Sequence, residues 1–156
     1  MRRLLLTLLL AMPLTLAAGE NPATAVQAAT LQRQDSPLSV RETAAALRTQ
    51  LESRGITVFA LVDHAAAAEK AGLSMPPTQV LLFGNPRGGT PLMQAHPDLA
   101  LDLPMRVLIR QTPDGKTEVL WRSADAMAAA QGLPTDALSA LAPLEKILQT
   151  LLAELQ

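Results

Sequence analysis

Two strand-like segments separated by a four-residue turn constrain this chain more than any other feature. Residues 105–111 and 117–122 are rich in β-branched and apolar side chains, and the turn sequence Pro-Asp-Gly-Lys lies between them at residues 113–116. Strand-like runs joined by such a turn predict a β-hairpin. Because the strands of a hairpin are antiparallel, the fold must contain at least one antiparallel pair.

Upstream of the hairpin, helical and strand-like segments alternate. Ser39 and Glu42 have the spacing of a capping box, so a helix is predicted to begin after Ser39. Residues 56–62 and 80–83 are short apolar runs and are predicted to form buried strands. Together with the hairpin, this order predicts a single α+β domain, in which a small mixed or antiparallel sheet has helices packed on one face.

The C-terminal part of the chain is predicted to be helical. Ser123 opens a helix that ends near Gly132, and an amphipathic C-terminal helix is predicted within residues 134–156. The domain is therefore expected to span residues 38–133. A leucine-rich stripe on the last helix is expected to face the core, and part of it could pack on a second subunit. The stripe consists of Leu138, Leu141, Leu144, Ile147, Leu148, Leu151, Leu152 and Leu155.

The N-terminal residues have the three-part pattern of a secretory signal peptide. Arg2 and Arg3 are followed by an apolar run over residues 4–16 and by small residues that end at Gly19. The apolar run is shorter than the roughly 20 residues that span a bilayer. We therefore predict a signal peptide at residues 1–19 and an exported mature protein, periplasmic or secreted, that does not insert stably into a membrane.

Residues 20–37 lack apolar periodicity and are predicted to be a flexible leader, with a short strand near residues 30–34.

Composition excludes several classes of site and partner. The chain has no cysteine, which excludes disulfides, thiolate metal ligands and a lipoprotein anchor. The net charge is −1 with both signs dispersed, and aromatic residues are scarce. Without a basic stripe or stacking platforms, nucleic acid is not an expected partner.

From Ser39 to about Gly132, short motifs occur in an order that is specific when they are taken together. They are Asp63-His64, Pro76-Pro77-Thr78, Phe83-Gly84-Asn85-Pro86, Gly89-Thr90-Pro91-Leu92-Met93 and Asp102-Leu103-Pro104. On these residues the chain resembles the family called domain of unknown function 302 (DUF302). The resemblance implies a compact α+β domain, often exported and sometimes dimeric, with no established general activity.

The chain also differs from the pattern of the family that it resembles. Members usually carry a segment like Tyr-Asn-x-Pro after the hairpin and an Arg-His pair before a closing Gly-Leu. A ligand that the family holds through those polar groups would lose them here. The corresponding positions are Trp121, Arg122 and Ala124, and then Ala130 and Gln131.

The best candidate for a binding site is the glycine-rich segment after the strand at residues 80–83. Free N–H groups at a helix start favour an anion, Arg87 adds positive charge, and glycines let a ligand approach the backbone. The alternative is a structural turn, in which Asn85 or the glycines have positive φ and Thr90 caps a helix with Pro91 at its first position. The candidate ligand-binding residues here are Gly84, Asn85, Arg87, Gly88, Gly89 and Thr90.

His64 is the other candidate ligand-binding residue. It follows the first predicted strand and lies next to Asp63, where it could act as an acid, a base or a ligand. The alternative is that Asp63 caps an alanine-rich helix over residues 65–71 and that His64 is simply an exposed or hydrogen-bonded side chain.

Three functions remain open from the sequence. The first is a non-enzymatic binding module that holds a small, anionic ligand at residues 84–90 near His64. The second is an envelope metal or redox accessory protein that uses His64, His96 and methionine, a ligand set that suits copper(I), although no metal-ligand spacing occurs. The candidate methionines are Met75, Met93 and Met105. The third is a homodimeric interaction domain without a small-molecule site. No reaction class and no cofactor follow from the sequence, so an enzyme is not the favoured interpretation.

Overall fold

The structure is a computed structural model that describes residues 31–156. The predicted signal peptide and residues 20–30 of the predicted leader lie outside the described residues. A five-stranded sheet has the strand order β1-β5-β4-β3-β2, and every neighbouring pair is antiparallel. The strands are β1 (Leu31–Ser36), β2 (Thr57–Asp63), β3 (Thr78–Gly84), β4 (Met105–Gln111) and β5 (Thr117–Arg122).

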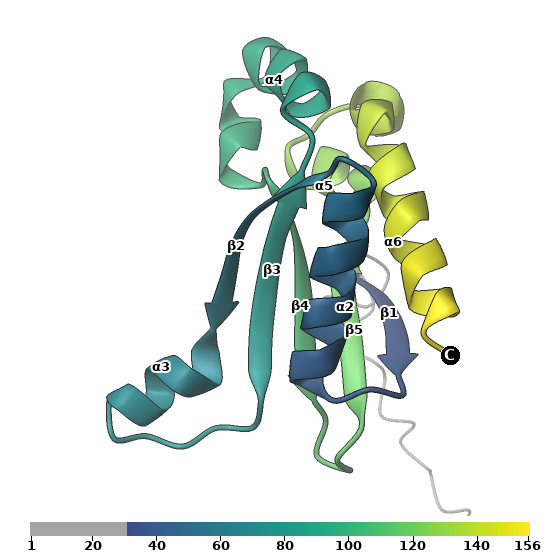
Figure 1. The fold of residues 1–156 in the computed structure, drawn as a ribbon. Helices are drawn as coiled ribbons and strands as arrows, with labels where there is room; N and C mark the ends of the chain where they lie inside the picture. Colours follow the sequence, from purple (N-terminus) through teal and green to yellow (C-terminus); the bar gives the residue numbers. More distant parts are fainter. Residues whose placement is uncertain (1–30) are drawn as a thin grey trace, which may run out of the picture.

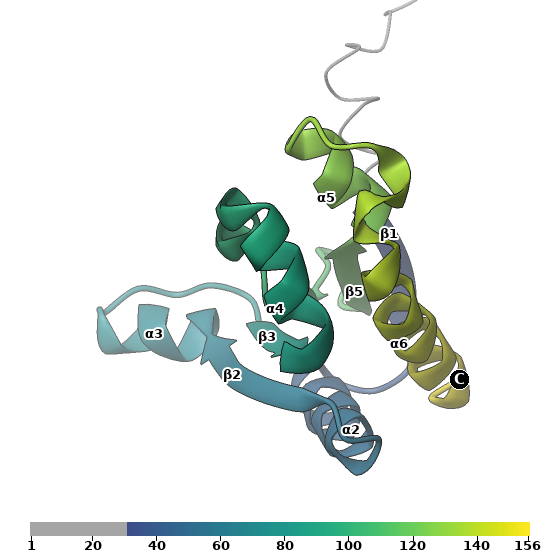
Figure 2. The ribbon, with the colours of Figure 1, turned by 90° about the horizontal axis from the view of Figure 1, so that it is seen from above.

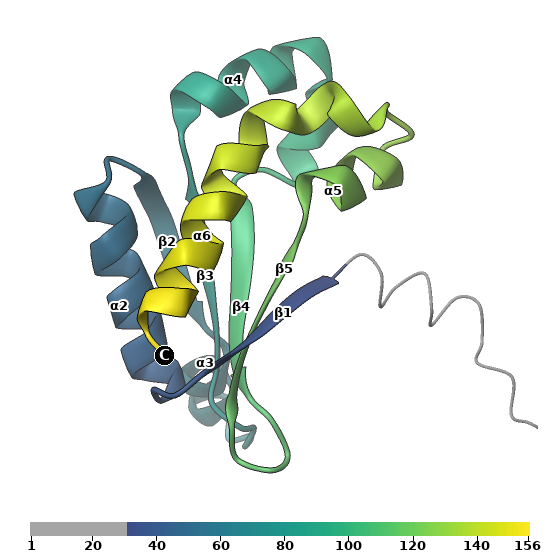
Figure 3. The same cartoon turned by 90° about the vertical axis from the view of Figure 1, so that its right-hand side faces the viewer.

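Two helices lie along one face of the sheet, as Figures 1 and 3 show. Helix α2 packs on β2, β3 and β4, and α6 packs beside it. Helix α3 lies at one end of β3, and α4 lies beyond the opposite end, nearest the viewer in Figure 2. The helices are α2 (Val40–Ser53), α3 (His64–Lys70), α4 (Pro86–Ala95), α5 (Ala124–Ala130) and α6 (Ala142–Glu154), with 3₁₀ segments η1 (Pro97–Leu101) and η2 (Thr135–Leu141).

The strongest local predictions are confirmed. Strands β4 and β5 pair as the predicted hairpin, and Gly115 takes the left-handed conformation that its turn requires (φ 83°). The Ser39 side chain accepts the Glu42 N–H while the Glu42 carboxylate accepts the Ser39 N–H, so the capping box is present. The single α+β domain with an antiparallel sheet is also as predicted. These features depend on residues close in sequence, which is why the pattern identified them.

An aliphatic core fills the space between the sheet and the helices α2 and α6. Alternate residues of the central strands point into it, as the two-residue period of a strand requires. Phe83 is the largest fully buried side chain and lies among aliphatic neighbours. Fully buried members of this cluster include Leu47, Leu51, Leu81, Val107, Ile109, Leu148 and Leu152.

The prediction that residues 56–62 form a buried strand is wrong in its burial. Strand β2 pairs with β3 alone, at the edge of the sheet, and its register shifts between Val58 and Ala60. Phe59, Leu61 and Val62 are 52%, 40% and 41% exposed. An apolar run specifies a strand, but its neighbours decide whether that strand is covered.

The predicted leader over residues 20–37 is also corrected in its last part. Residues 31–36 form β1, which extends the short strand expected near residues 30–34 and pairs with β5 along its whole length. Ser36 at its end is buried, and its hydroxyl lies 2.8 Å from that of Thr43 on α2. This segment has no apolar periodicity of its own. Its place in the sheet is therefore maintained by pairing with a distant strand and by a buried polar contact.

The predicted last helix is divided into η2 and α6. Pro143, which has no N–H to donate, stands in the first turn of α6, where that loss is tolerated. Leu144, Leu148, Leu151 and Leu152 are buried, and α6 packs on α2. The last helix therefore packs on the same core as residues 38–133. The stripe that suggested a homodimer has a partner within its own chain.

Candidate functional site

The glycine-rich segment that the sequence identified is the beginning of α4 rather than a loop before it. The Asn85 side chain accepts the Arg87 N–H at 3.0 Å, and Pro86 occupies the first helical position. Thr90 is therefore not the cap, and Pro91 lies inside the helix. An asparagine followed by proline is itself a helix-start signal, and it precedes the Thr-Pro pair that the sequence analysis favoured.

Small size, not unusual backbone geometry, distinguishes two of these glycines. Neither Asn85 nor any glycine of the segment has positive φ, so that expectation is wrong. A Cβ at Gly84 would lie 3.7 Å from both Phe59 and Pro104, and one at Gly89 would lie 3.8 Å from Leu103. The absence of side chains at Gly84 and Gly89 leaves space beside them.

That space is a cavity of about 240 Å³, here called the α4 pocket, between α4, the end of the sheet and the start of α6. Its lining is apolar apart from Asn85 and Thr90. Four of the predicted site residues line it, namely Gly84, Asn85, Gly89 and Thr90. Its apolar walls include Phe59, Met93, Leu103, Pro104, Met105 and Leu144.

The other predicted site residues do not reach the α4 pocket. Arg87 and Gly88 do not line it, and a Cβ at Gly88 would meet nothing within 4 Å. His64 is the exposed first residue of α3, and β3 separates α3 from α4 (Figure 1). A seven-residue strand is roughly 20 Å long. The structure therefore does not bring His64 to the segment at residues 84–90.

Asp63 acts as the predicted helix cap. Its carboxylate accepts the Ala66 N–H at 2.9 Å and the Gln79 Nε2 at 2.8 Å. These hydrogen bonds, first that from Ala66 and then that from Gln79, hold the pKa of Asp63 below its ordinary value. One oxygen thus caps α3 and the other joins Asp63 to Gln79 on β3, and the geometry gives no Asp–His couple with His64.

The proposed metal ligands are dispersed over the molecule. His96 is the C-cap of α4, whereas His64 begins α3 at the opposite end of β3. Met93 and Met105 line the α4 pocket, whereas Met75 lies beside Asp63 at the opposite end of β3. Within residues 31–156, no three His, Asp or Glu side chains are grouped as metal ligands.

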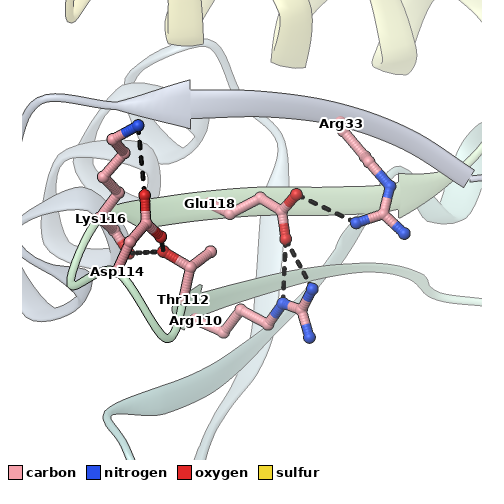
Figure 4. Close-up of polar contacts among 6 residues, drawn as sticks. All are labelled: Arg33, Arg110, Thr112, Asp114, Lys116 and Glu118. Carbon is pink, nitrogen blue, oxygen red and sulfur yellow. Dashed lines mark hydrogen bonds and ion pairs between the residues drawn. The ribbon is translucent and has the colours of Figure 1, made fainter.

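Sequence reasoning missed a charged network on the face of the sheet opposite α2 and α6 (Figure 4). Arg33 on β1 donates to Glu118 Oε1 at 3.0 Å, and Arg110 on β4 donates to Glu118 Oε2 from two nitrogens, at 3.0 and 2.8 Å. The Glu118 side chain is only 15% exposed. The signal available in the sequence was the alternation of charged and apolar residues along β4 and β5, which places Arg110 and Glu118 opposite one another.

The stability contributed by Glu118 should depend on pH. Burial raises the pKa of Glu118, but hydrogen bonds and charge from Arg110 and Arg33 outweigh burial and hold it below 4.5. The ionised carboxylate therefore stabilises the fold above about pH 4.5, and this contribution is lost as the pH falls through the lowered pKa. We expect the difference in melting temperature between the wild type and Glu118→Gln to shrink from pH 7 to pH 3.

The matched control for this prediction is Glu69→Gln. Glu69 is exposed and makes no ion pair among residues 31–156, so its replacement should change the pH 7 melting temperature less. A Glu118→Gln difference that stays constant over the whole pH range would contradict a stabilising ionised carboxylate.

The residues that depart from the family pattern gather near one end of β5. Trp121 is buried in the core, and its Nε1 has no partner among the described residues. Ala124 is the first residue of α5, and Ala130 is the last. Gln131, which follows α5, donates to Asp102 at 2.7 Å. Arg122 is exposed at the end of β5.

Comparisons with known proteins identify a domain type and a fold. The family described as "Domain of unknown function DUF302" matches residues 32–151. A crystal structure of an uncharacterized conserved DUF302 protein from Bacillus stearothermophilus has a TM-score of 0.70 and 18% identity, covering 81% of this chain and 98% of that one. At that identity the likeness shows the fold alone.

Curated relatives match over a shorter stretch. Proteins named fluoride-specific ion channel FluC 1 from Brucella suis and FluC 2 from Brucella melitensis are 45% identical over 82 residues, which is 53% of this chain. The match spans only 32% and 30% of those relatives, respectively. Between residues 31 and 156, this chain has no helix with the length and apolar character that crossing a membrane requires.

Proposed function

Since this chain belongs to the DUF302 family, whose description names no activity, we propose from its own geometry that it is a non-enzymatic binding protein for a small, mainly apolar molecule. The observation that carries the proposal is the α4 pocket, a preformed concavity with almost entirely apolar walls. Its two polar side chains, Asn85 and Thr90, would orient a ligand. The lining contains no titratable side chain among the described residues, which supports binding over acid–base chemistry.

The backbone at the α4 start favours an uncharged ligand over the anion that the sequence suggested. Pro86 has no N–H, and the Arg87 N–H is bound by the Asn85 side chain. The N–H groups of Gly88 and Gly89 both donate to the Asn85 carbonyl, at 3.0 and 2.9 Å. An anion at this helix start would have to displace bonds that already exist, and the Arg87 charge does not face the pocket.

The protein would bind the proposed ligand outside the cytoplasm. The signal-peptide pattern of residues 1–19 supports this location, because export and cleavage would release the domain into the periplasm or the medium. A domain without cysteine suits either compartment, since its stability does not depend on redox conditions.

Two glycine-to-leucine variants test the pocket. Gly89→Leu should fill it, because Gly89 lines the cavity, whereas Gly88→Leu places the same side chain on the same helix in open space. We expect wild type and Gly88→Leu to bind an uncharged probe such as indole equally in calorimetry. Gly89→Leu should bind it at least about tenfold more weakly, because its side chain occupies the space that the probe needs.

Folding does not confound this comparison. Leucine has a higher helix propensity than glycine by about 0.8 kcal/mol, so both variants should keep or raise the melting temperature. Equal binding by Gly89→Leu and wild type would refute the α4 pocket as the site. Binding of inorganic phosphate but not of indole, lost in Arg87→Gln, would restore the anion-binding hypothesis.

The curated relatives favour a second candidate, an accessory role beside a membrane ion channel. Its motivation is that an 82-residue part of proteins named fluoride-specific ion channels is 45% identical to this chain. If this role is correct, deletion of the gene should make cells more sensitive to fluoride in the growth medium. A Gly89→Leu allele then separates the candidates, because restored resistance would show that the α4 pocket is not needed for it.

A further inference from the structure

The face of the sheet that carries Glu118 also has a hollow of about 380 Å³ near the start of β4 and the end of β5, here called the sheet-face hollow. Its floor is a row of apolar side chains that the register aligns across three strands. Val80 on β3 lies opposite Leu108 on β4, which lies opposite Leu120 on β5. Met127 of α5 adds an apolar wall. The hollow shares a single lining residue, Met105, with the α4 pocket.

Arg106 and Arg122 lie at the rim of this hollow. Val107 pairs with Trp121, so the next position along the antiparallel ladder places Arg106 opposite Arg122 on the outer face. Both line the hollow and both are exposed. Like charges directly opposite one another on a sheet destabilise it, so this pair costs folding stability.

Nearby acids leave this pair without a carboxylate partner. Glu118 is engaged by Arg33 and Arg110. Asp102 also lines the hollow; its Oδ2 accepts the Gln131 amide, and its carboxylate forms no ion pair with either arginine. No ion pair within residues 31–156 joins an acid to Arg106 or Arg122. Arg106 donates to the Leu101 carbonyl, and Arg122 makes no side-chain hydrogen bond in the described chain.

We propose that the sheet-face hollow binds a single-chain aliphatic carboxylate. The carboxylate accepts hydrogen bonds from Arg122 and Arg106, whose planar guanidinium groups match it, and the alkyl chain covers the row from Val80 to Leu120. A ligand of this class matches both halves of the site, because it removes the repulsion between the arginines and buries apolar surface. Apart from Met105, no residue lines both this site and the α4 pocket, and the proposal does not rest on the proposed function.

The probe is decanoate, used below its micelle-forming concentration. Two controls each keep one half of it: 1-decanol has the alkyl chain without the carboxylate, and acetate has the carboxylate without the long chain. We expect decanoate to raise the melting temperature of the mature protein and to bind measurably in calorimetry, and both controls to bind at least about tenfold more weakly. Added salt should weaken decanoate binding but not raise the affinity of decanol.

Arg122→Gln is the decisive variant. It should weaken decanoate binding about tenfold or more and, without ligand, it should raise the melting temperature slightly by removing a repulsion. Arg87→Gln, an exposed arginine away from the hollow, should change neither quantity, and Gly89→Leu should leave decanoate binding intact. The proposal is overturned if the wild type does not bind decanoate, or if Arg122→Gln binds it as tightly as the wild type.

Discussion

Replacing Phe83 with alanine should lower the free energy of unfolding by about 3–5 kcal/mol. The Phe83 side chain is fully buried in β3, between the sheet and the helices that cover it. Its removal would leave a cavity lined by side chains such as Leu81 and Met105, which cannot close without moving the sheet. Urea or guanidinium unfolding, followed by circular dichroism, measures the change as a lower midpoint with a similar slope.

The matched control is Phe59→Ala, in the neighbouring strand β2. Phe59 is 52% exposed, so we expect its removal to cost about 1 kcal/mol. From the sequence alone, Phe59 and Phe83 belong to similar apolar runs and should have similar effects. Equal losses for the two variants would show that β2 is covered in solution, by a second copy or by another partner, and would contradict an exposed edge strand.

A chain that ends at Leu141 should not unfold cooperatively. The deletion removes α6 and with it four buried leucines, each of which contributes about 2–5 kcal/mol as judged from large-to-small replacements. Their combined contribution is comparable to the whole stability of a typical domain, about 5–15 kcal/mol. Deleting α6 would also expose the apolar surface of α2 and of the sheet. Circular dichroism over a thermal scan should show no sharp transition.

Point variants of α6 refine this test. Leu148→Ala should cost about 2–5 kcal/mol, because Leu148 is fully buried, whereas the adjacent and exposed Gln149→Ala should stay within about 0.5 kcal/mol. Light scattering of the same samples gives the oligomeric state. If the shortened chain kept its cooperative transition and only changed its association state, α6 would be an interface helix and not part of the core.

Short sequence motifs correctly predicted the helix caps and the turn, which depend on residues close together in the sequence. The capping box of Ser39 and Glu42, the cap at Asp63 and the turn around Gly115 each involve residues a few positions apart. Such contacts form in the same way wherever the segment lies, so the sequence predicts them well. The start of α4 was missed because two helix-start signals follow one another, and only the earlier one, at Asn85, operates.

Predictions about sites depended on which segments meet, and here the sequence was less informative. Gly84, Asn85, Gly89 and Thr90 do line one cavity, but its other walls come from β2, from the segment before β4 and from α6. No pattern within residues 84–90 indicates that these walls are apolar. The expectation of an anion used the helix start and Arg87, which are local to residues 84–90, whereas the apolar walls come from residues far along the chain.

By itself, the sequence determined the family, the antiparallel hairpin, the α+β class and most helix ends, because these follow from side-chain periods and backbone preferences over short stretches. Only the tertiary structure decided that β2 is an exposed edge and that residues 31–36 pair with β5 along their whole length. It also paired Val107 with Trp121, a register whose continuation brings Arg106 across from Arg122, and it separated His64 from α4. Each of these depends on contacts between residues far apart in the chain, whose burial and charge no local pattern encodes.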